Sequence, residues 1–155
     1  MNESPLLVSV EAVQVNDFEQ WLPFWLKYQE FYKVSIPEET TQVTWNRFFN
    51  DKEKIYCAVA RSSESPDTIL GFVHYLYHAS TWAINEFCYL EDLYVTPSAR
   101  GLQVGKQLIE FVQEQARKQQ CARLYWHTQE INLPGQRLYD WVAEKPGVIE
   151  YRMPL

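Results

Sequence analysis

The chain has 155 residues, of which 46% are hydrophobic and 15% aromatic, and this is enough for one real core. Its formal net charge of −6 argues against a nucleic-acid-binding module, which normally carries a basic face. The first residues show no basic stretch followed by an apolar run, and no segment approaches the roughly 20 apolar residues of a membrane span. We therefore expect a cytoplasmic protein without a membrane partner.

The first part of the chain predicts one strand and two helices. Residues 6–15 alternate loosely between apolar and polar side chains, as a strand does. From Asp17 onward apolar residues recur at helical spacing, and Pro23 predicts a kink or a restart in that helix. Pro37, followed by two glutamates, marks the start of a second helix. The side chains that this helix should bury are Val43, Trp45, Phe48 and Phe49.

The rest of the chain predicts a mixed sheet. Strands are expected at residues 55–60, 69–77, 86–95, 123–128 and 148–152, and helices after residue 103 and at 133–142. Short loops between the early strands imply antiparallel pairing, whereas the unit over 86–128 implies a parallel crossover. The pattern therefore predicts an α/β fold in a single domain over residues 1–155.

Three sets of residues are interpreted as structural. The cysteines are odd in number and far apart, which predicts reduced thiols rather than disulfides or metal ligands. The histidines have no metal-ligand spacing, and the tryptophans of the early helices fit a core better than a pocket. These residues are Cys57, Cys88, Cys121, His74, His78, His127, Trp21, Trp25 and Trp45.

The turn from Arg100 to Lys106 is the first candidate site. It joins an apolar strand to an amphipathic helix, so several backbone N–H groups and the positive end of a helix can face one anion. Phosphate capture and an ordinary strand-to-helix turn both fit this pattern. Neither a Walker loop nor a dinucleotide-binding fingerprint is present.

Glu91 and Asp92 are the second candidate site, because they interrupt the apolar strand just before that turn. Strand alternation predicts that they point to opposite faces, so at least one should lie on a covered face. A buried carboxylate with a raised pKa can act as a general base, although a strand-end acid bonded to a neighbouring group is the alternative. Tyr139, on the later short helix, is a candidate proton donor or a core tyrosine.

Together these motifs resemble the GNAT superfamily of acetyl-CoA-dependent N-acetyltransferases. The resemblance rests on residues 90–95 followed by 100–105, and on residues 126–132 leading to 137–140. It covers nearly the whole chain and is strongest toward the branch of diamine, polyamine and small amino-acid acetyltransferases. It implies a central sheet of six to seven strands, mostly antiparallel, with a splay between two parallel strands and about four helices.

The resemblance also implies residue roles. Backbone groups of Leu93, Tyr94 and Val95 would hold the pantetheine arm of acetyl-CoA. The pyrophosphate would be held by N–H groups of Arg100, Gly101, Leu102, Gln103, Val104, Gly105 and Lys106. Asn132 would also touch the cofactor, Tyr139 would protonate the leaving sulfur, and Glu91 would deprotonate the substrate amine. The acceptor side would comprise Glu91, Asp92 and Trp126, with no metal involved.

Two positions depart from the family pattern. Gln103 stands where the family has a glycine, and we expect its N–H to remain usable if its backbone is helical. Gly135 lies where helix formers are usual and should loosen the helix that carries Tyr139.

The expected activity is direct acetyl transfer, in a ternary complex, to a primary amine of a small molecule such as a polyamine, diamine or amino acid. Protein-lysine acetylation and a CoA-binding regulatory module with little transferase activity are the alternatives. A homodimer is what the resemblance suggests.

Overall fold

The computed structural model describes residues 4–155, and within them it forms one five-stranded sheet with the strand order β1-β2-β3-β4-β5. The strands β1 (Val8–Ala12), β2 (Ile55–Ser62), β3 (Ile69–His78) and β4 (Phe87–Val95) pair antiparallel in chain order. The last strand, β5 (Arg123–Tyr125), runs parallel to β4. The mixed sheet and the parallel crossover are therefore as predicted.

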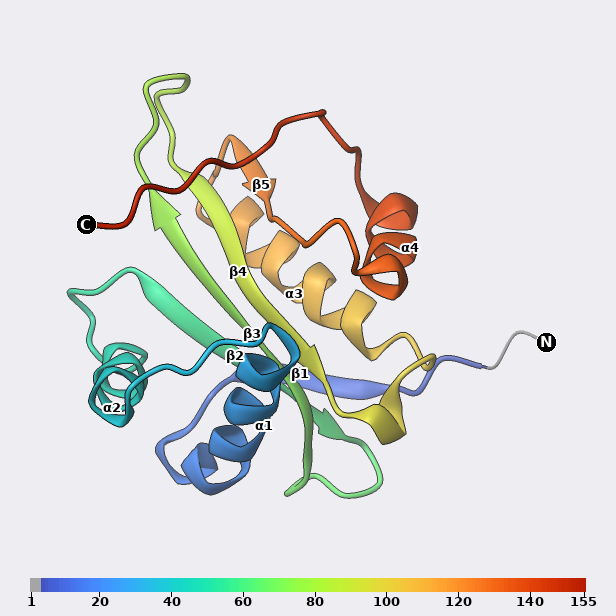
Figure 1. The fold of residues 1–155 in the computed structure, drawn as a ribbon. Coiled ribbons are helices and arrows are strands. Elements are labelled where there is room, and N and C mark those ends of the chain that lie inside the picture. Colours follow the sequence, from blue (N-terminus) through green and yellow to red (C-terminus); the bar gives the residue numbers. More distant parts are fainter. Residues whose placement is uncertain (1–3) are drawn as a thin grey trace.

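Four α-helices cover the two faces of the sheet (Figure 1). Helices α1 (Phe18–Phe31) and α2 (Glu38–Arg47) lie on one face, and α3 (Val104–Lys118) lies on the other. Helix α4 (Leu133–Val142) follows β5 and lies beside α3 (Figure 1). Two short 3-10 helices, η1 (Val15–Asp17) and η2 (Pro97–Ala99), precede α1 and α3.

Each face of the sheet has its own core. The α3 face is aliphatic, and α3 buries Val104, Leu108, Ile109, Val112 and Ala116 against it, as the helical spacing predicted. The opposite face is aromatic, with Trp21, Trp25 and Trp45 buried together over Phe72. The three tryptophans are therefore core residues. The three cysteines are free thiols, and two of them, Cys57 and Cys88, are buried.

Of the kink or restart expected at Pro23, the restart does not occur. Helix α1 runs through Pro23 as one helix, because the missing N–H would have bonded only the carbonyl of Glu19 in the first turn, and buried tryptophans anchor the helix on both sides. The expected burial of Val43 and Phe49 was wrong. In and after α2, Val43 and Phe49 are 43% and 40% exposed. Helix α2 contacts the aromatic core along a narrow stripe, so it buries only Thr41 and Trp45.

The predicted strand at 148–152 is absent, and the sheet has five strands rather than six to seven. An additional strand needs a partner edge, and β5 provides only three residues. After Gly147, whose φ is +81°, the chain instead crosses the molecule without pairing into the sheet (Figure 1). In the tail, Glu150 Oε1 lies 3.6 Å from Nδ1 of His127, two residues after the end of β5.

Candidate active site

A β-bulge in β4 places the two acidic residues. His74 pairs with Asp92 and Tyr75 with Leu90, so Glu91 is an extra residue without a partner on β3. As a result Leu90 and Leu93, three residues apart, both pack on the α3 face. The bulge breaks the alternation on which the prediction of opposite faces rested, and that prediction was wrong.

The same point of β4 is where the sheet opens. The parallel pairing with β5 ends at Tyr89 and Tyr125, and from Leu90 to Val95 the β4 backbone has no strand on its β5 side. Unpaired backbone N–H and C=O groups along a strand edge need other partners. The expected splay is therefore present, and it begins immediately beside the bulge.

Asp92 lies beside His74 and Tyr28. Its Oδ2 lies 2.9 Å from Nδ1 of His74, and burial together with the Asp92 carboxylate raises the pKa of the neighbouring Tyr28 hydroxyl. The Asp92 side chain is 13% exposed, and its only charge-type contact within residues 4–155 is with His74. Glu91 is more exposed, yet partial desolvation and the neighbouring Asp92 charge raise the pKa of its carboxyl. Glu91 thus has the property expected of a general base.

The turn before α3 is built from left-handed residues. Gly101 has a φ of +79°, and Gln103, the residue that caps α3, has φ +64° and ψ +22°. The right-handed helical geometry under which we expected the Gln103 N–H to remain usable is therefore not adopted. The left-handed conformation explains why a glycine is favoured there, and it leaves the N–H groups of Val104, Gly105 and Lys106 at a free helix start.

Gly105 brings three elements together. A Cβ atom at this position would lie 3.2 Å from Leu138 of α4, and 3.7 and 3.9 Å from Val95 and Leu93 of β4. The side chains of α4 and β4 therefore pack directly against the backbone at the start of α3, and the absence of a side chain on Gly105 permits this close approach. The packing brings the N-terminal turn of α3 next to the open edge of β4 and the helix of Tyr139.

Two cationic side chains of the turn are directed elsewhere. Arg100 donates from Nε to the carbonyl of Val95 at 3.0 Å and lies over the ring of Tyr94. Lys106 pairs with Glu110 at 2.5 Å and lies over Trp141. Anion binding at the turn therefore depends on the backbone N–H groups. On Arg100, only the guanidinium nitrogens other than Nε remain available to bind an anion.

Asn132 caps α4. Its Oδ1 accepts from the N–H of Gly135 at 3.2 Å, and its Nδ2 donates to Thr128 at 2.9 Å. A Cβ atom on Gly135 would lie 2.5 Å from Asn132 Nδ2. Gly135 therefore makes room for the cap that starts the helix, rather than only loosening it.

Tyr139 projects from α4 toward α1. Burial and the neighbouring Tyr32 raise its pKa to about 12, which keeps the hydroxyl protonated at neutral pH. Trp126 packs edge to face on Tyr139, with ring centroids 5.6 Å apart. Trp126 belongs to the core on the α3 face, whereas Asp92 faces α1, so the structure does not bring these two predicted acceptor residues together.

Sequence reasoning missed the tyrosines that connect the two halves of the site. Tyr28 and Tyr32 lie one turn apart on α1, with ring centroids separated by 4.8 Å. Burial and the Asp92 carboxylate raise the pKa of Tyr28. Burial raises the pKa of Tyr32, whose hydroxyl is also influenced by Thr128 and Asn132. The only signal in the sequence was their spacing of four on one helix face.

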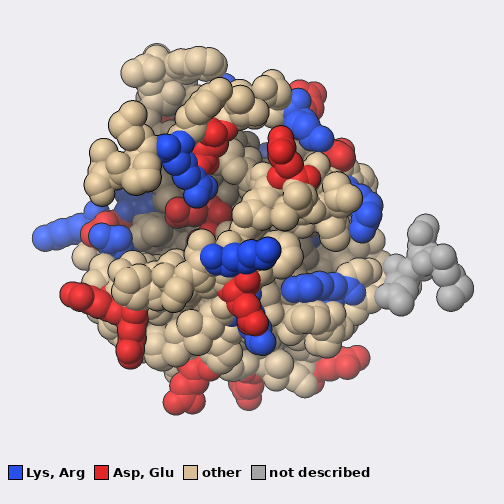
Figure 2. Space-filling model, in the orientation of Figure 1, with Lys and Arg blue, Asp and Glu red and all other residues tan. Residues whose placement is uncertain are grey.

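One face of the molecule is hollowed. Figure 2 shows acidic side chains recessed in a hollow on the face that the C-terminal tail crosses, with Lys or Arg side chains at its edge. Acidic side chains at the bottom of a hollow favour the binding of a cationic ligand.

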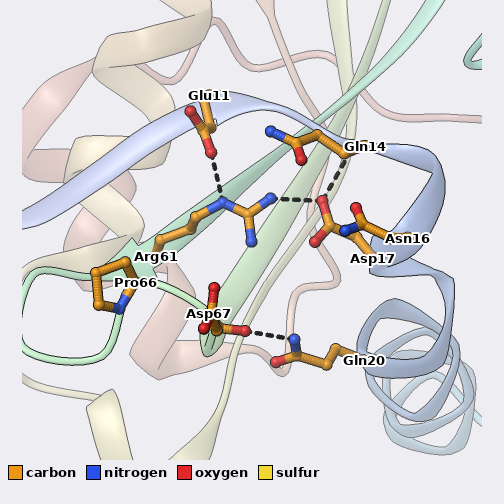
Figure 3. A pocket seen from close by; sticks show the side chains of 8 residues that line it. All are labelled: Glu11, Gln14, Asn16, Asp17, Gln20, Arg61, Pro66 and Asp67. Atoms are coloured by element: carbon orange, nitrogen blue, oxygen red, sulfur yellow. Dashed lines mark hydrogen bonds and ion pairs between the residues drawn. The ribbon is translucent and has the colours of Figure 1, made fainter.

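Two further cavities are lined by neither Glu91 nor Asp92. One, of about 360 Å³, surrounds Arg61, which pairs with Glu11 at 2.5 Å and Asp17 at 2.6 Å (Figure 3). The two ion pairs of Arg61 connect β2 to β1 and η1. The other, of about 510 Å³, lies between α3, β5 and α4 and includes Trp126, Trp141 and Lys106.

Among residues 4–155, no group of three or more His, Cys, Asp or Glu side chains is placed to hold a metal ion. None of the helices described is both long and apolar enough to cross a membrane.

Comparisons with known proteins agree with this geometry. The pattern of the acetyltransferase (GNAT) family matches residues 19–141. The chain is 39% identical to a D-amino-acid N-acetyltransferase of Saccharomyces cerevisiae over 94% of this chain and 89% of that one. It is 30% identical to the thialysine N-epsilon-acetyltransferase of Mus musculus over 78% and 75% of the two chains.

Solved structures share the fold. A probable acetyltransferase superposes with a TM-score of 0.81 at 23% identity, over 95% of this chain and 97% of that one. An aminoglycoside N-acetyltransferase in complex with CoA superposes with a TM-score of 0.79 at 18% identity, over 96% of both chains.

The splayed sheet and the free helix start define an acyl-CoA-dependent N-acetyltransferase. The chain belongs to the GNAT acetyltransferase family. Acetyl-CoA is its acetyl donor, and the residues present fit this molecule: the edge of β4 is open beyond Tyr89, and the N–H groups of the first turn of α3 are free of intrahelical partners.

Proposed function

We propose that this enzyme acetylates a primary amine of a small cationic molecule, such as a polyamine, a diamine or an amino acid. The observation that carries the proposal is the bulge of β4, which places Glu91 and Asp92 beside the splay where the donor's reactive end belongs. The names of the two relatives described above, a D-amino-acid and a thialysine acetyltransferase, support the same substrate class.

The proposed roles begin with the donor. Backbone groups of β4 from Leu93 to Val95 hold the pantetheine arm, and N–H groups from Arg100 to Lys106 hold the pyrophosphate. Asn132, at the start of α4, borders the same channel. Acetyl-CoA supplies an activated acetyl group that an amine can attack directly, without an acyl-enzyme.

The remaining roles concern protons. Glu91 accepts a proton from the acceptor ammonium, directly or through water, because its raised pKa brings it closer to neutral pH. Tyr139 donates a proton to the departing sulfur, because its pKa of about 12 keeps the hydroxyl protonated at neutral pH and so available as the donor. A backbone N–H of the open β4 edge stabilises the developing oxyanion. Holding the amine and the thioester together supplies much of the rate.

Thiol release tests the function. The purified chain is mixed with acetyl-CoA and a panel of diamines, polyamines, D- and L-amino acids, thialysine and a lysine peptide. Amine-dependent release of free thiol with small amines supports the proposal. Release with the peptide alone would favour protein-lysine acetylation, and tight CoA binding without release would favour a regulatory CoA-binding module.

Tyr139→Phe tests the proton donor. We expect turnover to fall roughly 100-fold, which is within the range for a general acid, while the dissociation constant of CoA changes little. The phenyl ring retains the contact with Trp126, so the fold should be preserved. Unchanged turnover would remove Tyr139 from the mechanism.

We also propose that residues 1–155 act as one domain and that the enzyme is a cytoplasmic homodimer. Three side chains of the tail, Val148, Ile149 and Met153, are 73%, 72% and 84% exposed, which is costly unless another surface covers them. The net charge of −6 supports the expectation that nucleic acid is not a partner. Sedimentation of the full chain and of a variant ending at residue 146 tests the dimer; equal mass for both as monomers would refute it.

A further inference from the structure

The charge state of His74 follows from its hydrogen bonds. The indole Nε1 of Trp21 lies 3.0 Å from His74 Nε2, and Nδ1 of the same ring lies 2.9 Å from Asp92 Oδ2. An indole N–H can only donate, so Nε2 of His74 must carry the lone pair. The single ring hydrogen is then on Nδ1, and it points at Asp92. This arrangement leaves the imidazole neutral.

The surroundings keep this ring in place. His74 is 2% exposed and is packed among the rings of Trp25, Phe48 and Phe72. Trp21, which sets the tautomer, is completely buried on α1. A ring held on all sides cannot rotate to offer its other nitrogen, so the donor to Asp92 is fixed.

Asp92 is consequently a carboxylate without a compensating cation. Its hydrogen-bond donor, the Nδ1–H of His74, is neutral, and within residues 4–155 no Lys or Arg pairs with it. Glu91, next to it, adds a second acid rather than a cation. A recessed carboxylate normally has a positive partner, and here the molecule itself does not provide one.

We infer that His74 is a positioning residue which, kept neutral by Trp21, holds Asp92 as an uncompensated carboxylate for the ammonium group of the acceptor. The inference rests on the proposed function and adds the substrate property that the site selects, a positive charge at the reacting end. A cationic imidazole would neutralise Asp92 and cancel that selection. The indole of Trp21 is therefore the group that preserves the charge of the subsite.

The tautomer can be tested without any activity. Long-range proton–nitrogen NMR of the uniformly ¹⁵N-labelled full chain at pH 7 distinguishes the two neutral tautomers from the imidazolium. The His74→Phe protein identifies the signal by its loss. We expect a protonated Nδ1 and an unprotonated Nε2. A protonated Nε2, in either the other tautomer or the cation, would overturn the inference.

Kinetics test the positioning role. In His74→Phe the aromatic packing is kept but the donor is lost, so we expect KM for the amine to rise about tenfold while KM for acetyl-CoA stays within twofold. In His74→Asn the side-chain amide can take the place of Nδ1–H, so we expect most of the loss to be rescued. Val73→Ala, a core change on the opposite face of β3, is the matched control and should leave KM for the amine unchanged.

The outcomes separate the two proposals. If no amine is acetylated, the proposed function fails, whereas the NMR result still decides the state of His74. If amines are acetylated but His74→Phe raises both KM values equally, or His74→Asn gives no rescue, the positioning role is refuted. A rise in KM for the amine but not for acetyl-CoA in His74→Phe, together with rescue in His74→Asn, supports the positioning role.

Discussion

Gln103 is the position where the structure makes the sharpest stability prediction. Its φ of +64° lies in the left-handed region, which costs a residue with a Cβ atom about 1–2 kcal/mol. Glycine avoids that cost but loses about 0.4–1 kcal/mol through the greater freedom of its unfolded chain. We therefore expect Gln103→Gly to raise the free energy of unfolding by about 0.5–1 kcal/mol.

Two variants isolate the cause. Gln103→Ala removes the side chain but keeps the Cβ atom, so it should not give this gain. Gln120→Gly changes a residue in the same conformation, with a φ of +56°, at the other end of α3. It should give a similar gain in stability without any change at the phosphate turn.

Urea unfolding measures the stability, and thermal unfolding should shift by about 2 °C for a chain of this size. Titration with CoA measures affinity, which should stay within about twofold in Gln103→Gly because the wild-type turn already has the glycine-like conformation. The reasoning would be refuted if Gln103→Gly were no more stable than Gln103→Ala. A tenfold gain in CoA affinity would show instead that the Gln103 side chain obstructs the site.

Three further predictions concern the same region. Gly101→Ala should lower the free energy of unfolding by about 0.5–1 kcal/mol in urea titrations, since a Cβ atom there meets nothing within 4 Å and the cost of the positive φ is only partly offset by the lower freedom of the unfolded chain. Gly135→Ala should raise KM for acetyl-CoA by displacing Asn132, although alanine is the better helix former. Glu91→Gln should remove the acidic limb of the profile of kcat/KM against pH, if Glu91 is the base. The raised pKa of Glu91 means that the folded state binds this proton more tightly than the unfolded state does, so stability is lost as pH rises through that pKa. Glu91→Gln should therefore be more stable than the wild type in urea at pH 7, with the difference fading toward pH 4.

Each of these three predictions can be contradicted by one experimental result. An unchanged midpoint in Gly101→Ala would remove the argument from backbone strain. An unchanged KM for acetyl-CoA in Gly135→Ala would separate Asn132 from the cofactor. An acidic limb that persists in Glu91→Gln would assign the proton to another acceptor.

Local signals in the sequence predicted the framework well. The helix at 133–142 was predicted to the residue, because Asn132 and Pro134 mark its start and the apolar spacing marks its length. The parallel crossover through α3 followed from the length of the connection between its two strands. Where the pattern lay within one element, its position could be predicted.

What the sequence could not give depends on contacts between distant residues. His74 was interpreted as an unremarkable sheet residue, because its partners Trp21 and Asp92 lie 53 and 18 positions away. The bulge at Glu91 left a signal, since two leucines three apart flank a pair of acids, but strand alternation was the simpler interpretation. The prediction of a last strand at 148–152 was wrong because β5, the strand with which it would pair, is too short.

The two ends of the chain lie next to different parts of the site. Near the N-terminus, Leu6 donates to the carbonyl of Leu102 at 3.0 Å and accepts from Gln107 of α3 at 2.7 Å, which buttresses the turn for the cofactor phosphates. At the other end the tail crosses the face with the acidic hollow (Figure 1). An affinity tag on the N-terminus would thus disturb the donor, and a tag on the C-terminus the acceptor, so comparing the two fusions would report on each substrate separately.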